Sequence, residues 1–288
     1  MYNDHYRLRE KPFALTPDPR FLYLSASHRE ALAHLLYGIE QGEGFIAVTG
    51  EVGTGKTTVC RTLIERVGER FEVAYLFNPR LSGLELLQAL HLELGLPAQG
   101  SRAELMDTLN RFLLETSRSG RGVLLLVDEA QNLPVDTLEE LRLLSNLETS
   151  TQKLLQIVLF GQPELDDLLD ARELRQLRQR IGVRWRLATL SSREAVDYVR
   201  HRLRVAAGGE AELFTSAALR ELRRRSRGVP RLVNLLADRA LLAGYADGSQ
   251  QVDRAHVGRA AREILSARDR RRRRLRSRRR GAPPERSE

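Results

Sequence analysis

One stretch of the chain has the residue types and spacing of a phosphate-binding loop. Residues 50–58 read GEVGTGKTT and match the pattern G-x-x-x-x-G-K-[ST] at every fixed position. In such a loop the glycines let backbone N–H groups face phosphate oxygens, the lysine reaches the β- and γ-phosphates, and the threonine hydroxyl is a ligand for Mg²⁺. We therefore expect nucleotide binding by Gly50, Glu51, Val52, Gly53, Thr54, Gly55, Lys56, Thr57 and Thr58.

A second stretch supplies two carboxylates. The run VLLLVDEAQ (123–131) is a short apolar segment that ends in Asp128 and Glu129. A buried strand would deliver Asp128 to the edge of a sheet, where it can hold Mg²⁺, and would place Glu129 to orient and deprotonate an attacking water. Together with the loop upstream, this pair predicts an Mg²⁺-dependent nucleoside triphosphatase.

The nucleotide is expected to be ATP. No [NT]-K-x-D motif, which selects guanine, occurs in the chain, and its only lysines are Lys11, Lys56 and Lys153. A small-molecule kinase is disfavoured because Asp128 and Glu129 suit the activation of water better than that of a substrate hydroxyl.

Five further residues are candidates for contacts with the γ-phosphate. Gln162 follows the run IVLFG (157–161) and would lie between nucleotide and acidic pair, although Gln162-Pro163 also suits a helix start. Arg178 and Arg180 precede the last predicted strand and could act on a neighbouring subunit's nucleotide, as could Arg175; a solvated basic face is the alternative. Arg231, after Gly-Val-Pro, could reach back to the phosphate, or be a surface arginine.

Elements that position these residues can be read from the apolar pattern. Short apolar runs predict strands at 45–50, 72–77, 122–128, 154–160 and 183–187, and helical patterns separate them. This alternation predicts parallel βαβ units with helices on both faces of the sheet. No strand pattern recurs beyond residue 190, where helices are expected near 192–206, 215–226, 230–244 and 253–267.

The pattern also divides the chain. We expect an N-terminal segment at 1–24, a nucleotide-binding α/β core at 25–190, an all-helical lid at 191–267 and a disordered tail at 268–288. Ser27 with Glu30 and Ser191 with Glu194 are expected as helix capping boxes, and 163–180 as helical.

The positive charge of the chain is concentrated in the tail. The net charge is +9 over 288 residues, and residues 268–288 contain eleven arginines against three acidic residues. The rest of the chain is therefore near neutral, which disfavours a basic nucleic-acid-binding body. A tail of this kind could hold the protein near anionic lipid or nucleic acid, by about 1 kcal/mol per arginine at a membrane surface.

Two features of the sequence bear on the location of the protein. A single cysteine, Cys60, fits a reducing compartment, and no apolar run approaches the length of a membrane span. We expect a cytoplasmic protein, with the tail as a peripheral link to the inner face of the membrane.

The motifs taken together resemble AAA+ ATPases of the ExeA family, the general secretion pathway protein A type. The resemblance covers about residues 1–266. The similar stretches are FALTPDPRFLYLSASHREALAHLLYGI, GFIAVTGEVGTGKTT, DEAQ, FGQPEL, LSSREAVDYVRHRL and GVPRLVNLLADRALLAGYA. It implies a three-layer P-loop NTPase (AAA+) core with a parallel sheet, followed by an all-helical lid. It also implies ATP hydrolysis and a homo-oligomer with nucleotide at subunit interfaces.

The resemblance bears on individual residues too. It assigns the trans arginine to Arg180 or Arg178 and matches Arg231 and Gln162 to γ-phosphate sensors. It also puts the segment Phe21 to Tyr23 near adenine, with His28 nearby. Family members of the secretion type continue into a transmembrane helix and a peptidoglycan-binding region, and this sequence ends at Glu288.

Three functions remain open at this point. The first is an ATP-driven switch or motor that supports assembly of a secretion, pilus or polysaccharide-export system, with unidentified envelope components as partners. The second is a DNA-associated AAA+ regulator such as a transposition helper. The third is a scaffold that binds nucleotide without turning it over, which the intact pair of Asp128 and Glu129 disfavours.

Overall fold

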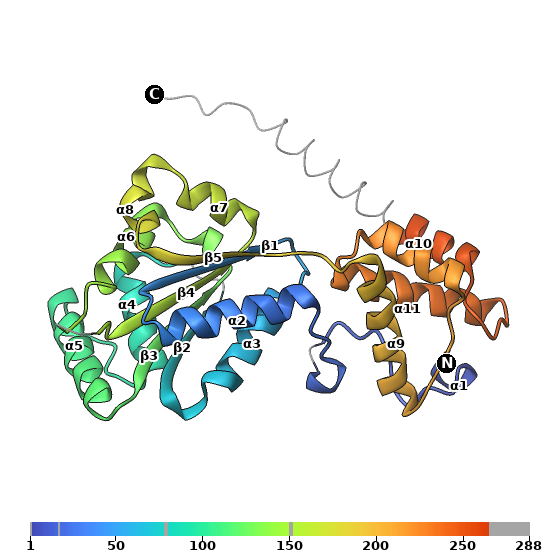
Figure 1. Ribbon diagram of the computed structural model, residues 1–288, viewed down its shortest axis with the longest axis horizontal. Coiled ribbons are helices and arrows are strands. Elements are labelled where there is room, and N and C mark those ends of the chain that lie inside the picture. Colours follow the sequence, from blue (N-terminus) through green and yellow to red (C-terminus); the bar gives the residue numbers. More distant parts are fainter. Residues whose placement is uncertain (1, 17, 78–79, 150–151, 265–288) are drawn as a thin grey trace, which may run out of the picture. The chain divides into compact units, whose positions relative to one another are not determined.

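The structure is a computed structural model that describes residues 2–16, 18–77, 80–149 and 152–264 (Figure 1). The chain forms two compact units. One spans Leu24–Ala188, and the other combines Met1–Tyr23 with Thr189–Glu288. The tail expected at 268–288 lies outside the described residues.

The unit Leu24–Ala188 is built on a five-stranded sheet. Its strands are β1 (Phe45–Gly50), β2 (Phe71–Phe77), β3 (Gly122–Asp128), β4 (Leu155–Gly161) and β5 (Ile181–Leu187). All neighbours pair in parallel in the order β2-β3-β4-β1-β5. Because β4 lies between β1 and β3, the carboxyl ends of these three strands meet at one edge of the sheet.

Helices cover both faces of this sheet (Figure 1). On one face lie α2 (Ala26–Glu40) and α3 (Lys56–Val67). On the other lie α4 (Gly83–Glu93), α5 (Arg102–Arg118), α6 (Val135–Leu144), α7 (Pro163–Leu169) and α8 (Arg175–Arg178). Three short 3-10 helices complete the unit: Gly68–Arg70, Ala130–Asn132 and Arg172–Leu174.

The central strands explain the three layers. In β3, Val123, Leu125 and Val127 point into the core beneath α4 to α8, whereas Leu124 and Leu126 point into the core beneath α2 and α3. Side chains alternate along a strand, so a strand buried on both faces must be apolar throughout. This confirms the predicted fold class, a parallel α/β core followed by helices.

One local prediction was wrong, and another lacked a detail that the structure adds. The capping box of α2 uses Ser25 and His28, while Ser27 Oγ accepts a hydrogen bond from the backbone N–H of Ala188 at 2.9 Å. The helical patterns expected at 163–180 form α7, a 3-10 helix and α8, with a break between them because Asp170 ends α7 and Ala171 is extended, with φ −61° and ψ 149°. The break lets Leu174 and Leu177 turn into the same core as the leucines of α7.

The second unit is helical, with α1 (Tyr2–His5), a 3-10 helix (Pro19–Phe21), α9 (Ser192–Ala207), α10 (Ser216–Ser226), α11 (Pro230–Ala246) and a helix at 254–264. The box of Ser191 and Glu194 begins α9 as predicted. None of the helices in the described ranges has the length and apolar character needed to cross a membrane.

The N-terminal segment packs into this helical unit. The buried guanidinium of Arg202 on α9 donates to the carbonyls of Pro12 at 2.5 Å and Ala14 at 3.1 Å, and lies 4.8 Å from the centre of the Phe21 ring. Tyr2 Oη donates to Asp238 of α11 at 2.5 Å. Segments from both ends of the described chain thus share one hydrophobic core.

Candidate functional site

The loop after β1 forms a cradle of backbone N–H groups. Gly53 and Gly55 have φ of 84° and 104°, in the left-handed region that favours glycine, and α3 begins at the next residue. Among the described residues, no acceptor is present for the amides of Gly53, Gly55, Lys56, Thr57 and Thr58. Unpaired amides at a helix N-terminus, together with the helix dipole, make a site for an anion such as phosphate.

Lys56 lies inside this loop. Its side chain is 5% exposed, and Nζ donates to the carbonyls of Gly50 at 2.7 Å and Glu51 at 3.3 Å. Burial lowers its pKa, while the negative charges of Glu129, Asp128 and other nearby carboxylates oppose that change. A buried ammonium held by two carbonyls would gain from the negative charge of a phosphate.

A buried histidine packs against the phosphate-binding loop. His28 is 4% exposed, its Nδ1 accepts from the Ser25 N–H at 3.2 Å, and its Nε2 lies 2.8 Å from the Thr54 carbonyl oxygen. Since Nδ1 accepts, Nε2 carries the proton and donates to Thr54. A Cβ atom at Gly55 would lie 2.5 Å from Nε2, so glycine permits this close approach.

Asp128 faces the start of α3. One carboxylate oxygen, Oδ2, accepts from Thr57 Oγ1 at 3.0 Å and from Tyr75 Oη at 3.2 Å, and the other accepts from the Glu129 N–H at 2.9 Å. Burial, and then the charge of Asp128, raise the pKa of Tyr75, which keeps the phenol a hydrogen donor. A hydroxyl and a carboxylate at this distance are hard oxygen ligands of the kind that Mg²⁺ prefers. The described residues contain no cluster of three His, Cys, Asp or Glu side chains that could hold a metal ion.

Glu129 leaves the strand in a left-handed conformation, with φ 56° and ψ 38°. Its carboxylate oxygen Oε2 accepts two hydrogen bonds, from Gln131 Nε2 at 2.6 Å and from Gln162 Nε2 at 2.8 Å. Gln162 comes directly after β4, so the strand order brings it beside the acidic pair.

The candidate arginines have different surroundings. Arg180 donates to Ser145 Oγ at 3.1 Å and to Asn146 at the end of α6. Arg178 lies 3.9 Å from Asp170, and Arg175 is exposed. Arg231 is exposed in the first turn of α11, in the helical unit. The contacts of Arg180 are within its own unit, and its action on a neighbour stays a prediction.

The aromatic residues expected near adenine lie in the core of the helical unit. Phe21 is buried there, and the Tyr23 ring meets the Tyr198 ring edge to face at 5.7 Å between centres. Their contact with a nucleotide stays a prediction.

Comparisons with known proteins bear on the identity of this chain. Residues 39–169 match the AAA domain family. General secretion pathway protein A of Aeromonas hydrophila is 47% identical over 271 residues, which make up 93% of this chain and 49% of that protein. The chain is therefore an AAA-domain protein related to general secretion pathway protein A. It spans about half the length of that curated relative.

Solved structures agree on the fold. The ORC2 protein of Aeropyrum pernix has a TM-score of 0.63 at 20% identity, with 88% of this chain and 71% of that chain covered. The RuvB branch migration motor of Thermotoga maritima has a TM-score of 0.56 at 18% identity, with 85% and 73% covered. At these identities the likeness shows the AAA fold, and an AAA domain implies nucleotide binding.

Two residues at this edge of the AAA domain escaped sequence reasoning. Tyr75 was part of an apolar strand, and its contact with Asp128 depends on the pairing of β2 with β3. Gln131 stood in the motif DEAQ, but its contacts depend on the turn at Glu129. The only signal was the presence of polar groups at or beside strand ends.

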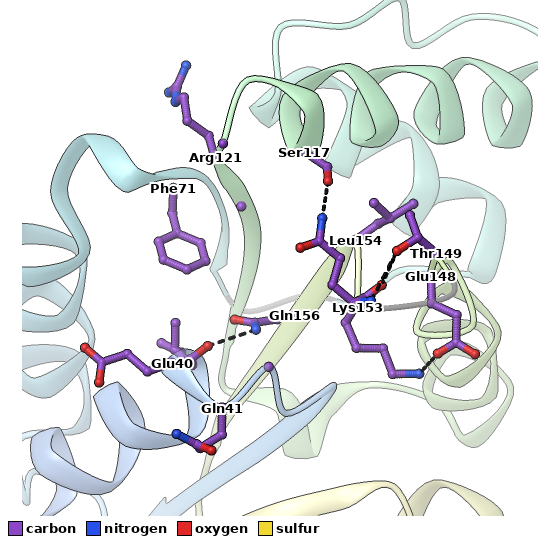
Figure 2. Close-up of a pocket in the computed structure, with 15 residues that line it drawn as sticks. Glu40, Gln41, Phe71, Ser117, Arg121, Glu148, Thr149, Lys153, Leu154 and Gln156 are labelled. Carbon is purple, nitrogen blue, oxygen red and sulfur yellow. Dashed lines mark hydrogen bonds and ion pairs between the residues drawn. The ribbon is translucent and has the colours of Figure 1, made fainter.

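A cavity of about 660 Å³ lies at the opposite edge of the sheet (Figure 2). It is lined by the first residues of β2 and β3 and by Gln156 near the start of β4, whose Nε2 donates to the Ile39 carbonyl at 3.0 Å. Among the lining residues, Lys153 forms an ion pair with Glu148. Arg121 forms an ion pair with Glu72 at 2.6 Å, a contact that Figure 2 does not draw. These two cations are already neutralised, so the cavity does not resemble the phosphate cradle.

Proposed function

We propose that the chain binds ATP with Mg²⁺, hydrolyses it, and uses the cycle as a switch or motor that supports assembly of a secretion, pilus or polysaccharide-export system. The observation that carries the chemical part is the convergence at the carboxyl ends of β1, β3 and β4. Unpaired amides, Lys56, the pair of Thr57 and Asp128, and Glu129 all lie at that one edge.

Each residue has a part in this proposal. The loop amides and Lys56 bind the phosphates, and Thr57 and Asp128 would hold Mg²⁺, which would neutralise charge on the β- and γ-phosphates. Glu129 accepts the proton of the attacking water, and Gln162 orients groups at the γ-phosphate. The hydrogen bond of 3.0 Å between Thr57 and Asp128 supports a shared metal site.

We further propose a homo-oligomer in which Arg180 or Arg178 reaches the nucleotide of a neighbouring subunit, and in which Arg231 links the helical unit to the γ-phosphate. An arginine supplied in trans would stabilise charge in the transition state. Both proposals rest on the positions of these residues in the sequence relative to the AAA domain.

The role in secretion rests on the relative. The identity of 47% extends over 93% of this chain, and the relative is described as a general secretion pathway protein. We propose that this chain acts in the cytoplasm and that its arginine-rich tail contacts anionic lipid at the inner face of the membrane or nucleic acid.

The test of the chemical proposal is a steady-state ATPase assay with Mg²⁺, in the wild type and in Lys56→Ala and Glu129→Gln. We expect turnover in the wild type, loss of ATP binding in Lys56→Ala, and a loss of turnover of about 10²–10⁴-fold with retained ATP in Glu129→Gln. A wild type that binds ATP and turns none over, alone or with DNA or anionic vesicles, would contradict hydrolysis and leave a nucleotide-binding scaffold.

The test of the biological part compares stimulation of turnover by anionic vesicles and by duplex DNA, with residues 268–288 present and removed. Stimulation by vesicles that needs the tail supports the membrane-side role. Stimulation by DNA alone would instead identify a DNA-associated regulator.

A further inference from the structure

The side chain of Gln131 joins two parts of the candidate site. It lies on the 3-10 helix Ala130–Asn132, two residues after the left-handed residue Glu129. Its Nε2 donates back to Glu129 Oε2 at 2.6 Å, and its Oε1 accepts from the backbone N–H of Gln162 at 2.9 Å. Both ends of the amide are therefore satisfied, one by the carboxylate and one by the chain that leaves β4.

Gln162 closes a ring of hydrogen bonds. Its side-chain Nε2 donates to the same oxygen of Glu129 at 2.8 Å. Glu129 Oε2 thus has two donors, whereas Oε1 has no donor among the residues that the structure describes. One oxygen of the carboxylate is fixed, and the other remains available to a water molecule.

The close approach of Gln131 to β4 depends on a glycine. A Cβ atom at Gly161 would lie 3.1 Å from Gln131 Oε1 and 2.5 Å from a methyl carbon of Leu165. The residue before Gln162 therefore has no room for a side chain, and the turn of β4 into α7 brings the Gln162 amide within reach of Gln131. This packing is consistent with the arrangement that the hydrogen bonds describe.

We propose that Gln131 is a positioning residue for the general base. It holds Glu129 Oε2 against the end of β4 and leaves Oε1 to take the proton of the attacking water, a role that rests on the proposed ATP hydrolysis. Gln131 retains this hold when the Gln162 side chain turns toward the γ-phosphate, because the Gln131 contact uses only the backbone of Gln162. Misplacing a catalytic group by about 1 Å can cost 10²-fold in rate.

Two substitutions separate positioning from a structural role. Gln131→Glu is close in size and keeps an oxygen that accepts from the Gln162 N–H, but it loses the donor to Glu129 and adds a like charge. Gln131→Met loses both hydrogen bonds at similar volume. Gln99→Glu serves as the matched control, because Gln99 is exposed in the loop between α4 and α5.

Three quantities are measured for each protein: kcat at saturating ATP, Kd for a non-hydrolysable ATP analogue, and the free energy of unfolding in urea. We expect kcat to fall about 10- to 100-fold in Gln131→Glu and in Gln131→Met, with Kd within about threefold of the wild type. Gln99→Glu is expected to match the wild type in all three.

A further readout needs no hydrolysis. In nucleotide-free protein, the side-chain NH₂ protons of Gln131, assigned by their loss in Gln131→Met, should exchange more slowly than those of Gln99. They should lose this protection in Glu129→Ala, because their acceptor is removed.

The outcomes are distinct. An active wild type together with unchanged kcat in Gln131→Glu would overturn the positioning role, as would a Kd that rises as much as kcat falls. No hydrolysis in the wild type above that of Lys56→Ala would refute the proposed function and the positioning role with it.

Discussion

The packing of His28 beneath Gly55 gives a prediction with a calculable cost. Gly55 has φ 104°, and a Cβ atom there would lie 2.5 Å from His28 Nε2 and 3.3 Å from Cε1. Gly55→Ala therefore meets two separate penalties. One is the backbone conformation, which any L-residue adopts with strain, and the other is the displacement of His28.

The two penalties can be estimated. A left-handed conformation costs an L-residue about 1–2 kcal/mol. Displacing the imidazole breaks the hydrogen bond of 2.8 Å to the Thr54 carbonyl, which costs about 1–2 kcal/mol because a buried acceptor is left without a partner. We expect Gly55→Ala to lower the free energy of unfolding by about 2–4 kcal/mol.

The assay is equilibrium unfolding in urea. The chain contains one tryptophan, Trp185 on β5, which stacks on His34 and so reports the unfolding of the unit that contains the loop. Affinity for an ATP analogue is measured in parallel and should fall at least about tenfold, because the amides after Gly55 move with it.

The test of the reasoning is the same substitution in a His28→Ala background. Without the imidazole only the backbone penalty remains, so Gly55→Ala should then cost about 1–2 kcal/mol. If it costs as much in this background as in the wild type, the close approach of His28 is not the reason for glycine at this position.

Three further predictions concern other contacts. Tyr75→Phe removes the donor at 3.2 Å from Asp128, and should raise the Mg²⁺ concentration for half-maximal ATPase activity by about three- to tenfold; an unchanged requirement would contradict a role at the metal. Hydrogen bonds from the partly exposed Arg224 and Arg225 lower the pKa of Glu221 to about 2, so its stabilisation is present above its ordinary pKa of 4.5 and is lost as pH falls toward 2. Glu221→Gln should therefore lower the free energy of unfolding, measured in urea titrations, by about 1–2 kcal/mol at pH 7 and by progressively less below pH 4.5. A loss of stability that does not depend on pH would show that the charge of Glu221 is not its cause. Arg180→Ala should lose ATPase activity and regain part of it when mixed with Lys56→Ala, because the first variant provides an intact nucleotide site and the second provides the arginine. No recovery would argue against action in trans.

The three central strands of the sheet were predictable because they are apolar on both faces. The runs at 45–50 and 122–128 coincide with β1 and β3, since a strand buried by two layers leaves little room for polar residues. The capping box of α2 was not predictable by the usual rule, because a histidine occupies the position expected for Glu or Gln. The break at Ala171 was hidden because leucines continue on both sides of it.

The candidate site could be predicted only in part from the sequence, for a related reason. The phosphate-binding loop and the pair of Asp128 and Glu129 are each formed by consecutive residues, so the sequence of each motif alone suggests its chemistry. Tyr75 reaches Asp128 only because β2 lies beside β3, and Gln131 reaches Gln162 only because β4 lies beside β3. Such contacts depend on strand order, which local pattern does not specify.

The position of β1 in the sheet has a consequence for how the protein forms. β1 carries the phosphate loop, yet its only partners in the described sheet are β4 and β5, with Phe45 opposite Ile157 and Ile181. A chain that emerges from the ribosome in order must therefore hold β1 unpaired while β2 and β3 are made, and pairing so distant in sequence is slow. Nucleotide affinity should appear only once β4 and β5 are in place, so that a bound nucleotide marks a completed core.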